Sequence, residues 1–420
     1  FLRCFAAYWH ISVCAEQLHC GGIGMGLNHK AEKKNNGALD EVKRRIRESI
    51  RYNQPDFWLL LAIIMLLGLG TMMVFSASSA SAYSLNAQSD AYTILKKQLV
   101  FAVLGVAAML IVSVIDYKVL ARFAIPFFGF CIALLVLVQL IGTTHNNAKR
   151  WLNFGIEFQP SELYKIAVIL FLAYVFSRPG LSYKAVRLLG ILIYIVPVGI
   201  GIGLIALQPH ISCVLIVGMV MVAMMFAGRV KLPTYLCMGL CAGLLAVVVF
   251  ATKSVNFEYI AERFTTFLDP EHDTSGDSYQ IMQSLYAISS GGLFGKGFGK
   301  GVQKYLYLPE PYNDFILSIL AEELGFVGVT LVLGLFTLFI WRGYKIARNA
   351  PDKFSSLTAF GITTLITIQV LMNVAVVTSS MPVTGISLPF FSYGGTSLVI
   401  LLASMGILLN ISKQSHYEKF

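Results

Sequence analysis

Residues 57–79 read FWLLLAIIMLLGLGTMMVFSASS and contain no charged side chain. A helix needs about 20 mainly apolar residues to cross the hydrocarbon core of a bilayer, so this stretch is long enough to span a membrane. Nine further apolar runs follow, at about 98–115, 120–141, 162–177, 188–206, 210–228, 233–251, 314–341, 357–379 and 396–412. We therefore predict an all-α polytopic membrane protein with ten transmembrane helices.

The composition excludes a soluble globular protein. Of the 420 residues, 56% are hydrophobic and only 13% are charged, about half of the roughly 25% typical of soluble domains. The formal charge is +10, but the basic residues are dispersed between the apolar runs, so we expect no nucleic acid as partner. The seven cysteines form neither a CxxC metal pair nor a disulfide framework.

Lys and Arg in the connections between the runs predict the orientation. They gather in alternate connections, and the excess of Lys and Arg in short loops marks the cytoplasmic side. We therefore expect a basic cytoplasmic segment at 1–56, a ten-helix domain at 57–412 and a cytoplasmic tail at 413–420. No methionine precedes Met25, which leaves open whether residues 1–24 belong to the natural chain.

Four polar stretches fall on the opposite, extracytoplasmic side in this topology. They are 143–161, 208–210, 252–314 and 380–395, and the longest contains the large loop 252–313 between the seventh and eighth helices. No ATP is available outside a cell. A bond-forming reaction on this face therefore needs a substrate that is already activated and is delivered through or along the membrane.

The stretch around the start of the fourth span carries the first candidate site. Glu162 and Lys165 are spaced to share one face of a helix, and an ionisable pair near the membrane boundary is costly unless it faces a cavity. With Arg150, whose guanidinium can bind phosphate oxygens in pairs, they suit an anionic headgroup. For Lys149 with Trp151, an anchor at headgroup level is an equally good interpretation.

The large outer loop contains a glycine-rich run, GGLFGKGFGKG at 291–301. It lacks the spacing and the trailing Ser or Thr of a phosphate-binding P-loop. A flexible cationic loop that folds over a lipid headgroup is one interpretation, and a plain flexible connector is another. In the short turn 208–210 we expect His210 to be a solvated residue without a catalytic role.

The end of this loop carries an acidic candidate, Asp314. Two prolines precede it, and Asn313 or Asp314 is suited to cap the eighth helix. A carboxylate at the outer mouth of a membrane helix is equally a candidate functional group. Helical spacing places Glu323 nearly opposite to Asp314, so Glu322 and Glu323 are expected to bond elsewhere. The proline- and glycine-rich stretch 381–395 is expected to line a cavity, because irregular backbone at membrane depth needs cover.

Together these stretches resemble the family of shape, elongation, division and sporulation (SEDS) proteins, ten-span bacterial membrane proteins that include FtsW, RodA and SpoVE. The matching motifs are Lys149-Arg150-Trp151, Gln159-Pro160-Ser161-Glu162 and the stretches 291–297, 308–316 and 381–395, in the family's order. The resemblance runs from about Phe57 to Ser412. Pro309-Glu310-Pro311, residues 321–325 and residues 373–385 look more like the FtsW and SpoVE branch than RodA.

The resemblance implies a peptidoglycan glycosyltransferase that polymerises lipid II on the outer face of the cytoplasmic membrane, in cell division or sporulation, with a class B penicillin-binding protein as transpeptidase partner. The family's essential aspartate corresponds to Asp314. The same motifs imply substrate-binding roles, which fall on Lys149, Arg150, Trp151, Gln159, Glu162, Lys165, Glu310, Ser392 and Tyr393. Two departures are His210, where the family often has Asp, and Tyr312, where it often has His.

We expect Asp314 to act as general base on a sugar hydroxyl while undecaprenyl pyrophosphate leaves, with Arg150 and Lys165 neutralising its charge. The sequence shows no dedicated cluster of metal ligands, so dependence on a divalent cation stays open. Two other functions remain as alternatives: a transporter that flips lipid II across the membrane, and a noncatalytic scaffold that recruits the transpeptidase.

Overall fold

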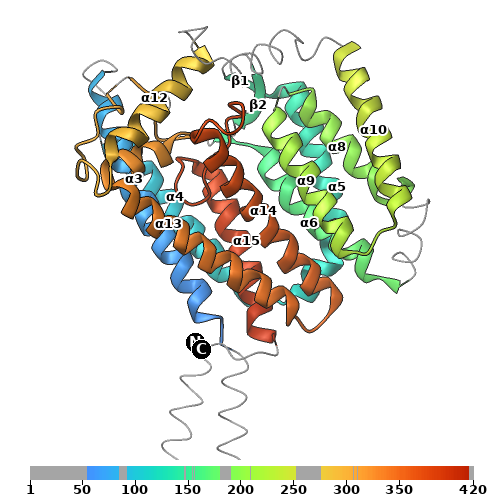
Figure 1. Ribbon diagram of the computed structural model, residues 1–420. Helices are drawn as coiled ribbons and strands as arrows, with labels where there is room; N and C mark the ends of the chain where they lie inside the picture. Colours follow the sequence, from blue (N-terminus) through green and yellow to red (C-terminus); the bar gives the residue numbers. More distant parts are fainter. Residues whose placement is uncertain are drawn as a thin grey trace, which may run out of the picture. The chain divides into compact units, whose positions relative to one another are not determined.

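The computed structural model of the chain (Figure 1) describes residues 54–84, 92–145, 148–153, 155, 157–179, 191–208, 210–251, 276–305, 307–309 and 311–415. Nearly all of the predicted basic amino-terminal segment lies outside these residues. So do the part of the outer loop at 252–275, the predicted site residue Glu310 and most of the carboxy-terminal tail.

Each of the ten apolar runs lies largely in helical structure, over the residues that the structure describes. The first six of these helices are α3 (Phe57–Ser84), α4 (Tyr92–Val114), α5 (Tyr117–Ile141), α6 (Pro160–Ser177), α8 (Val196–Ala206) and α9 (Ile211–Ala227). A π-helical turn, η2 (Ile191–Ile195), leads into α8. The later helices are α10 (Leu232–Ala251), α12 (Gly276–Gly291), α13 (Ile316–Arg348), α14 (Lys353–Val377) and α15 (Gly395–Gln414). Only α12 lies outside the apolar runs, within the predicted outer loop.

Seven of these helices are long and apolar enough to cross a membrane, as judged over the described residues, and α9 is apolar but shorter. The multi-pass, largely helical architecture predicted from the sequence is therefore confirmed. The count of ten membrane-spanning helices stays a prediction.

The helices pack so that α6 and α14 are the most enclosed. α14 contacts α6, α9 and α13, while α15 packs along α4 and α5 packs on α6. In the apolar part of α6, 78% of the residues are buried, against 28% for α4. Polar side chains on α6 and α14 therefore face protein, where they need partners or a cavity.

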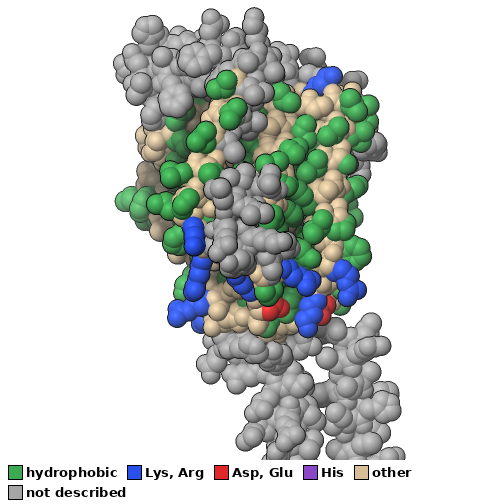
Figure 2. Space-filling view, turned by 90° about the vertical axis from the view of Figure 1, so that its right-hand side faces the viewer, with side chains coloured by type: hydrophobic (Ala, Val, Ile, Leu, Met, Phe, Trp, Pro, Cys, Tyr) green, Lys and Arg blue, Asp and Glu red, His purple; other side chains and the backbone are tan. Residues whose placement is uncertain are grey.

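The outer surface of the bundle is apolar. On α10, Leu232, Leu236, Leu240 and Leu244 follow one face at a spacing of four residues and are all exposed. Figure 2 shows this side of the molecule as a broad hydrophobic surface with Lys and Arg gathered along its lower edge. A soluble protein rarely exposes such a surface, whereas a lipid bilayer covers it.

A small antiparallel sheet was not predicted from the sequence. It consists of β1 (Thr143–His145), β2 (Ala148–Asn153) and β3 (Glu157–Phe158), in the order β1-β2-β3. Trp151 pairs with Thr143, and Asn153 with Glu157. The sheet links α5 to α6 and presents Lys149, Arg150 and Trp151 on β2, just before the Glu162–Lys165 pair.

Helix α13 is broken near its start and tied down at its end. Gly325 has φ 67° and ψ −167°, a backbone conformation that only glycine adopts readily, so residues before it form a separate short helix. At the far end, the Arg342 guanidinium makes a bidentate ion pair with Asp56 at 2.5–3.1 Å. Both side chains are buried, and Asp56 also caps the start of α3 through the Leu59 amide.

Candidate functional site

The Glu162–Lys165 pair lies in the first turns of α6. The Lys165 amine lies 2.7 Å from a Glu162 carboxylate oxygen, and the two side chains are 5% and 20% exposed. Proline at the first helical position, Pro160, fixes the start of the helix and thereby the face on which the pair lies. The structure therefore confirms the predicted pairing, and it places the lysine in the protein interior.

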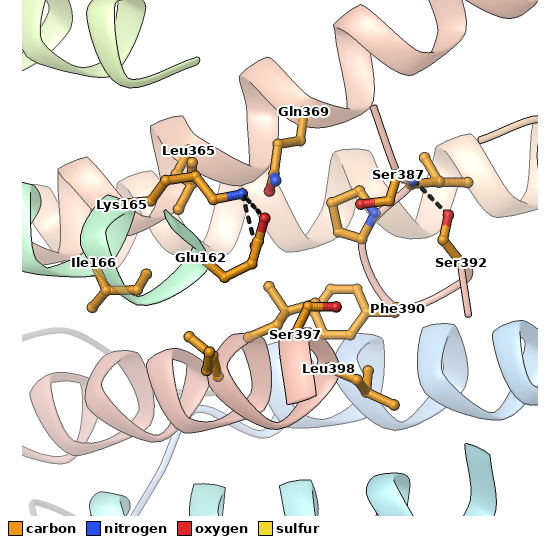
Figure 3. A pocket seen from close by; sticks show the side chains of 14 residues that line it. Glu162, Lys165, Ile166, Leu365, Gln369, Ser387, Phe390, Ser392, Ser397 and Leu398 are labelled. Carbon is orange, nitrogen blue, oxygen red and sulfur yellow. Dashed lines mark hydrogen bonds and ion pairs between the residues drawn. The ribbon is translucent and has the colours of Figure 1, made fainter. Parts of the chain in front are cut away.

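The pair faces a cavity of about 40 Å³ between α6, α14 and α15. Figure 3 shows the two side chains pointing toward each other, with Gln369 of α14 above them and Ser397 of α15 below. Of the predicted site residues, Glu162, Lys165 and Ser392 line this cavity. A volume of this size holds one or two water molecules, so a sugar ring needs a wider site.

Asp314 lies in the turn just before α13. The helix begins at Ile316 and its capping residue is Phe315, which makes no side-chain capping bond. The expectation that Asn313 or Asp314 caps this helix is therefore wrong. The side chain of Asp314 is partly exposed, and a Cβ atom added to Gly385 would lie 3.2 Å from its Oδ2 atom. The carboxylate thus borders the irregular stretch 381–395.

Three sets of hydrogen bonds join the Asp314 turn to this stretch. Asn373 of α14 donates to the carbonyls of Asp314, at 2.9 Å, and Ile386, at 2.7 Å. The Ser392 hydroxyl donates to the Asn313 carbonyl at 2.6 Å and accepts from the Leu388 amide at 2.8 Å. The Tyr393 amide donates to the Tyr312 carbonyl at 2.9 Å, and these two tyrosine rings meet edge to face.

The stretch 385–392 therefore contacts both parts of the predicted site. Gly385 borders Asp314, while Ser387, Leu388 and Ser392 line the cavity that holds Lys165. Asp314 itself does not line that cavity. The prediction that 381–395 forms a cavity wall is correct, and the wall separates the carboxylate from the buried ion pair.

The turn between α8 and α9 approaches the same region. The Arg150 guanidinium donates to the Gln208 carbonyl at 3.1 Å, the Ser161 hydroxyl lies 3.5 Å from Nδ1 of His210, and the Ser212 hydroxyl donates to the Thr384 carbonyl. His210 is therefore not the solvated residue that we expected. Burial, followed by the charges of Arg150 and Lys165, lowers its pKa to about 3, so the ring is neutral at physiological pH.

The remaining described residues that were predicted for the site do not line the cavity beside Lys165. Lys149 is exposed, Trp151 is partly exposed on β2, and Gln159 is buried before α6 without a side-chain capping bond. Burial, and then the charge of Glu157, raises the pKa of Tyr393. Among the described residues, no cluster of three or more His, Cys, Asp or Glu side chains is arranged to hold a metal ion.

Hydrogen bonds and ion pairs join the glycine-rich run to residues Glu322 and Glu323. The expectation of a flexible loop stays a prediction. The buried carboxylates of Glu322 and Glu323 accept from the amides of Gly299, Val302 and Gln303 at 2.8–3.1 Å. Lys296 and Lys304 neutralise them, each at 2.7 Å. The two glutamates therefore bond to this loop, and Glu323 also bonds to Ser76 of α3.

Sequence reasoning missed Asn373 and Gln369, which reach the site from α14. Both lie inside an apolar run, and polar side chains within a membrane helix usually face the bundle interior. That signal was available at 357–379. The sequence does not show which polar side chains of α14 point toward the site. Others, such as Thr358 and Thr363, are buried but do not line the cavity.

A family model described as cell cycle protein, of the FtsW, RodA and SpoVE group, matches residues 57–417. The probable peptidoglycan glycosyltransferase FtsW of Trichlorobacter lovleyi is 41% identical over 372 residues, which cover 87% of this chain and 95% of that protein. Stage V sporulation protein E of Bacillus subtilis is 39% identical over 367 residues, covering 86% and 98%.

Two solved structures are similar over most of their length. One is a chain from a study of how a peptidoglycan synthase complex coordinates polymerization and crosslinking, with a TM-score of 0.67 and 28% identity over 86% of this chain and 98% of that one. The other is the rod shape determining protein RodA of Thermus thermophilus, with a TM-score of 0.59, 28% identity and coverages of 86% and 98%. The chain therefore belongs to the FtsW, RodA and SpoVE family, and to its FtsW and SpoVE branch.

Proposed function

We propose that this protein is a peptidoglycan glycosyltransferase that polymerises lipid II on the extracytoplasmic face of the bacterial cytoplasmic membrane, in division or sporulation. The names of its FtsW relatives support the activity. The observation that carries the proposal is the position of Asp314. Its side chain is partly exposed and borders Gly385, in a turn that is tied to α14 and to 385–393.

In the proposed reaction Asp314 removes the proton from the 4-hydroxyl of the acceptor sugar. The hydroxyl oxygen bonds to the anomeric carbon of the donor, and the bond from that carbon to the pyrophosphate oxygen breaks. The electron pair leaves with undecaprenyl pyrophosphate. A positioned base contributes about 10²- to 10⁴-fold to such a rate.

The cationic side chains would stabilise the leaving pyrophosphate. Arg150 is partly exposed and donates to the Gln208 carbonyl, and the Lys165 amine has Glu162 as its counter-ion. Fixed cations that face the charge formed during the reaction lower its barrier. Since the cavity beside Lys165, at about 40 Å³, is too small for a sugar ring, we expect lipid II to widen it by moving the stretch 385–392.

The distribution of Lys and Arg supports cytoplasmic termini and an external site. A class B penicillin-binding protein is the proposed partner. This proposal is supported by the similarity to a chain of a synthase complex in which polymerization and crosslinking are coordinated. Dependence on a divalent cation is tested by comparing polymerisation with and without a chelator.

The test uses the purified protein in vesicles with labelled lipid II, with and without the transpeptidase. Glycan polymer and lipid translocation are measured separately. We expect wild-type protein to make polymer and Asp314→Asn to make none. The matched control is Asp116→Asn, a carboxylate-to-amide change at the start of α5 that keeps a good capping residue. Translocation without polymer favours a flippase, and equal polymer from both variants refutes the assigned base.

A further inference from the structure

The loop between α12 and the break in α13 has an exposed apolar tip, which consists of Leu293, Phe294 and Phe298. These side chains are 65%, 80% and 45% exposed. The proposed glycosyl transfer does not use them, and none lines the cavity beside Lys165. Large apolar side chains that are exposed together on a loop indicate a site that contacts a protein or a membrane.

The apolar tip is continuous with the exposed surface of α13. The Phe326 amide donates to the Gly292 carbonyl at 2.9 Å, and the Val327 amide donates to the Leu293 carbonyl at 3.1 Å. Phe326 and Val327 are themselves 65% and 50% exposed. Because α13 is one of the helices long and apolar enough to cross a membrane, we expect its exposed apolar side chains to face lipid, and the tip is joined to that surface.

The length of α13 places the tip at membrane depth. Trp341, 57% exposed, has Lys345 and Arg342 over its ring at 5.4 and 5.5 Å. Trp beside Lys and Arg is typical of the membrane–water interface. From Trp341 back to Phe326 an ideal helix covers about 22 Å, whereas the hydrocarbon core is about 30 Å thick. Any tilt of α13 brings Phe326 deeper still.

The polar backbone groups of this loop have partners within the protein, as a position inside the membrane requires. Irregular backbone within a membrane requires that its polar groups are satisfied by protein. The amides of Gly295, Lys296 and Gly297 donate to the carbonyls of Gly291, Glu322 and Glu323. The amides of Gly299, Val302 and Gln303 donate to the two buried carboxylates, which Lys296 and Lys304 neutralise.

We propose that the apolar tip inserts into the acyl region of the bilayer leaflet on the Asp314 side, and that residues 291–299 form a membrane-embedded, non-helical element. Lys300 is exposed beside the tip, and its long side chain reaches the headgroup level. The element anchors the start of α13, and with it the turn that carries Asp314, at a constant depth.

The test is photocrosslinking to lipid in vesicles of phosphatidylethanolamine and phosphatidylglycerol that carry a radiolabel in the acyl chains. Phe294, Leu331 and Pro351 are replaced, one at a time, by p-benzoylphenylalanine. Leu331 is 54% exposed within α13 and serves as the lipid control. Pro351 is exposed in the polar turn between α13 and α14 and serves as the water control. Each variant is purified as a monodisperse protein before reconstitution, so that label is counted per folded molecule.

We expect position 294 to take up label to a similar extent as position 331 and several-fold above position 351. Uptake at 294 no higher than at 351 would overturn the proposal, because the tip would then face water and be free for a protein partner. The vesicles contain this chain alone and no lipid II. The result therefore does not depend on glycosyl transfer, and loss of polymerase activity would leave it unchanged.

Discussion

Asn373 is predicted to hold Asp314 in its working position. Its amide nitrogen donates to the carbonyls of Asp314 and Ile386, and the residue is 1% exposed. Replacement by leucine keeps a similar size but leaves two carbonyls without this donor. An unsatisfied buried polar group costs about 1–3 kcal/mol. We therefore expect Asn373→Leu to lower the free energy of unfolding by about 2–6 kcal/mol in total, less where water enters the turn.

The loss of these two hydrogen bonds should also slow the reaction. If about 1.4 kcal/mol of this loss, less than the lower figure, appears as misplacement of the base in the transition state, kcat falls about tenfold. The assay is polymerisation of lipid II in vesicles, with kcat expressed per folded molecule and KM measured in parallel. We expect kcat to fall more than KM changes, because the bonds act on the turn that carries Asp314.

Asn410 provides a matched control. It is 4% exposed, donates to the Ser113 carbonyl at 2.9 Å and accepts from the Tyr117 amide at 3.2 Å, where α15 meets the connection between α4 and α5. Asn410→Leu should lose comparable stability and keep its kcat per folded molecule. Wild-type kcat in Asn373→Leu, or an equal loss of kcat in both variants, would refute a positioning role for Asn373.

Three further predictions concern buried charges. Glu162→Gln should destabilise the protein more than Lys165→Met, as measured by thermal unfolding. It leaves the more deeply buried charge, that of Lys165, unpaired, at a cost of about 3–5 kcal/mol. Equal losses of stability in the two variants would contradict this. The folded-state pKa of His210, about 3, lies below the ordinary histidine value of 6.5, so the folded state gives up stability as pH falls from 6.5 toward 3. His210→Gln should flatten that decline and leave the pH–rate profile above pH 6.5 unchanged; an unaltered decline would argue against it. Arg342→Met should cost about 3–5 kcal/mol by removing the guanidinium that forms a buried ion pair with Asp56. Asp56→Asn in the same chain should restore much of this loss without changing kcat, and additive losses would exclude the coupling.

Composition and spacing predicted the helical membrane architecture, because lipid imposes a length and an apolar content that single segments reveal. The Glu162–Lys165 pair followed in the same way from helical spacing. The break at Gly325 could not be predicted in this way, and neither could the bonds of Glu322 and Glu323 to the glycine-rich loop. They depend on contacts between segments whose register only packing decides, and a positive φ at one glycine among 36 has no local signal.

The capping prediction at Asp314 failed for a related reason. An acidic residue ahead of an apolar run predicts an N-cap, but Asn373, Ser392 and Tyr393 hold this turn from other segments. Helix α13 then begins one residue later than a cap at Asp314 requires. Tertiary hydrogen bonds outweighed the local preference, and they place the carboxylate beside Gly385.

The most direct test of the account measures glycan polymer made from lipid II by purified wild-type and Asp314→Asn protein in the same vesicles. We expect polymer from wild type and none from Asp314→Asn, and the unfolding temperature of each protein is measured so that polymer is counted per folded molecule. Polymer from the Asp314→Asn protein at the wild-type rate would contradict the central claim that this carboxylate is the base.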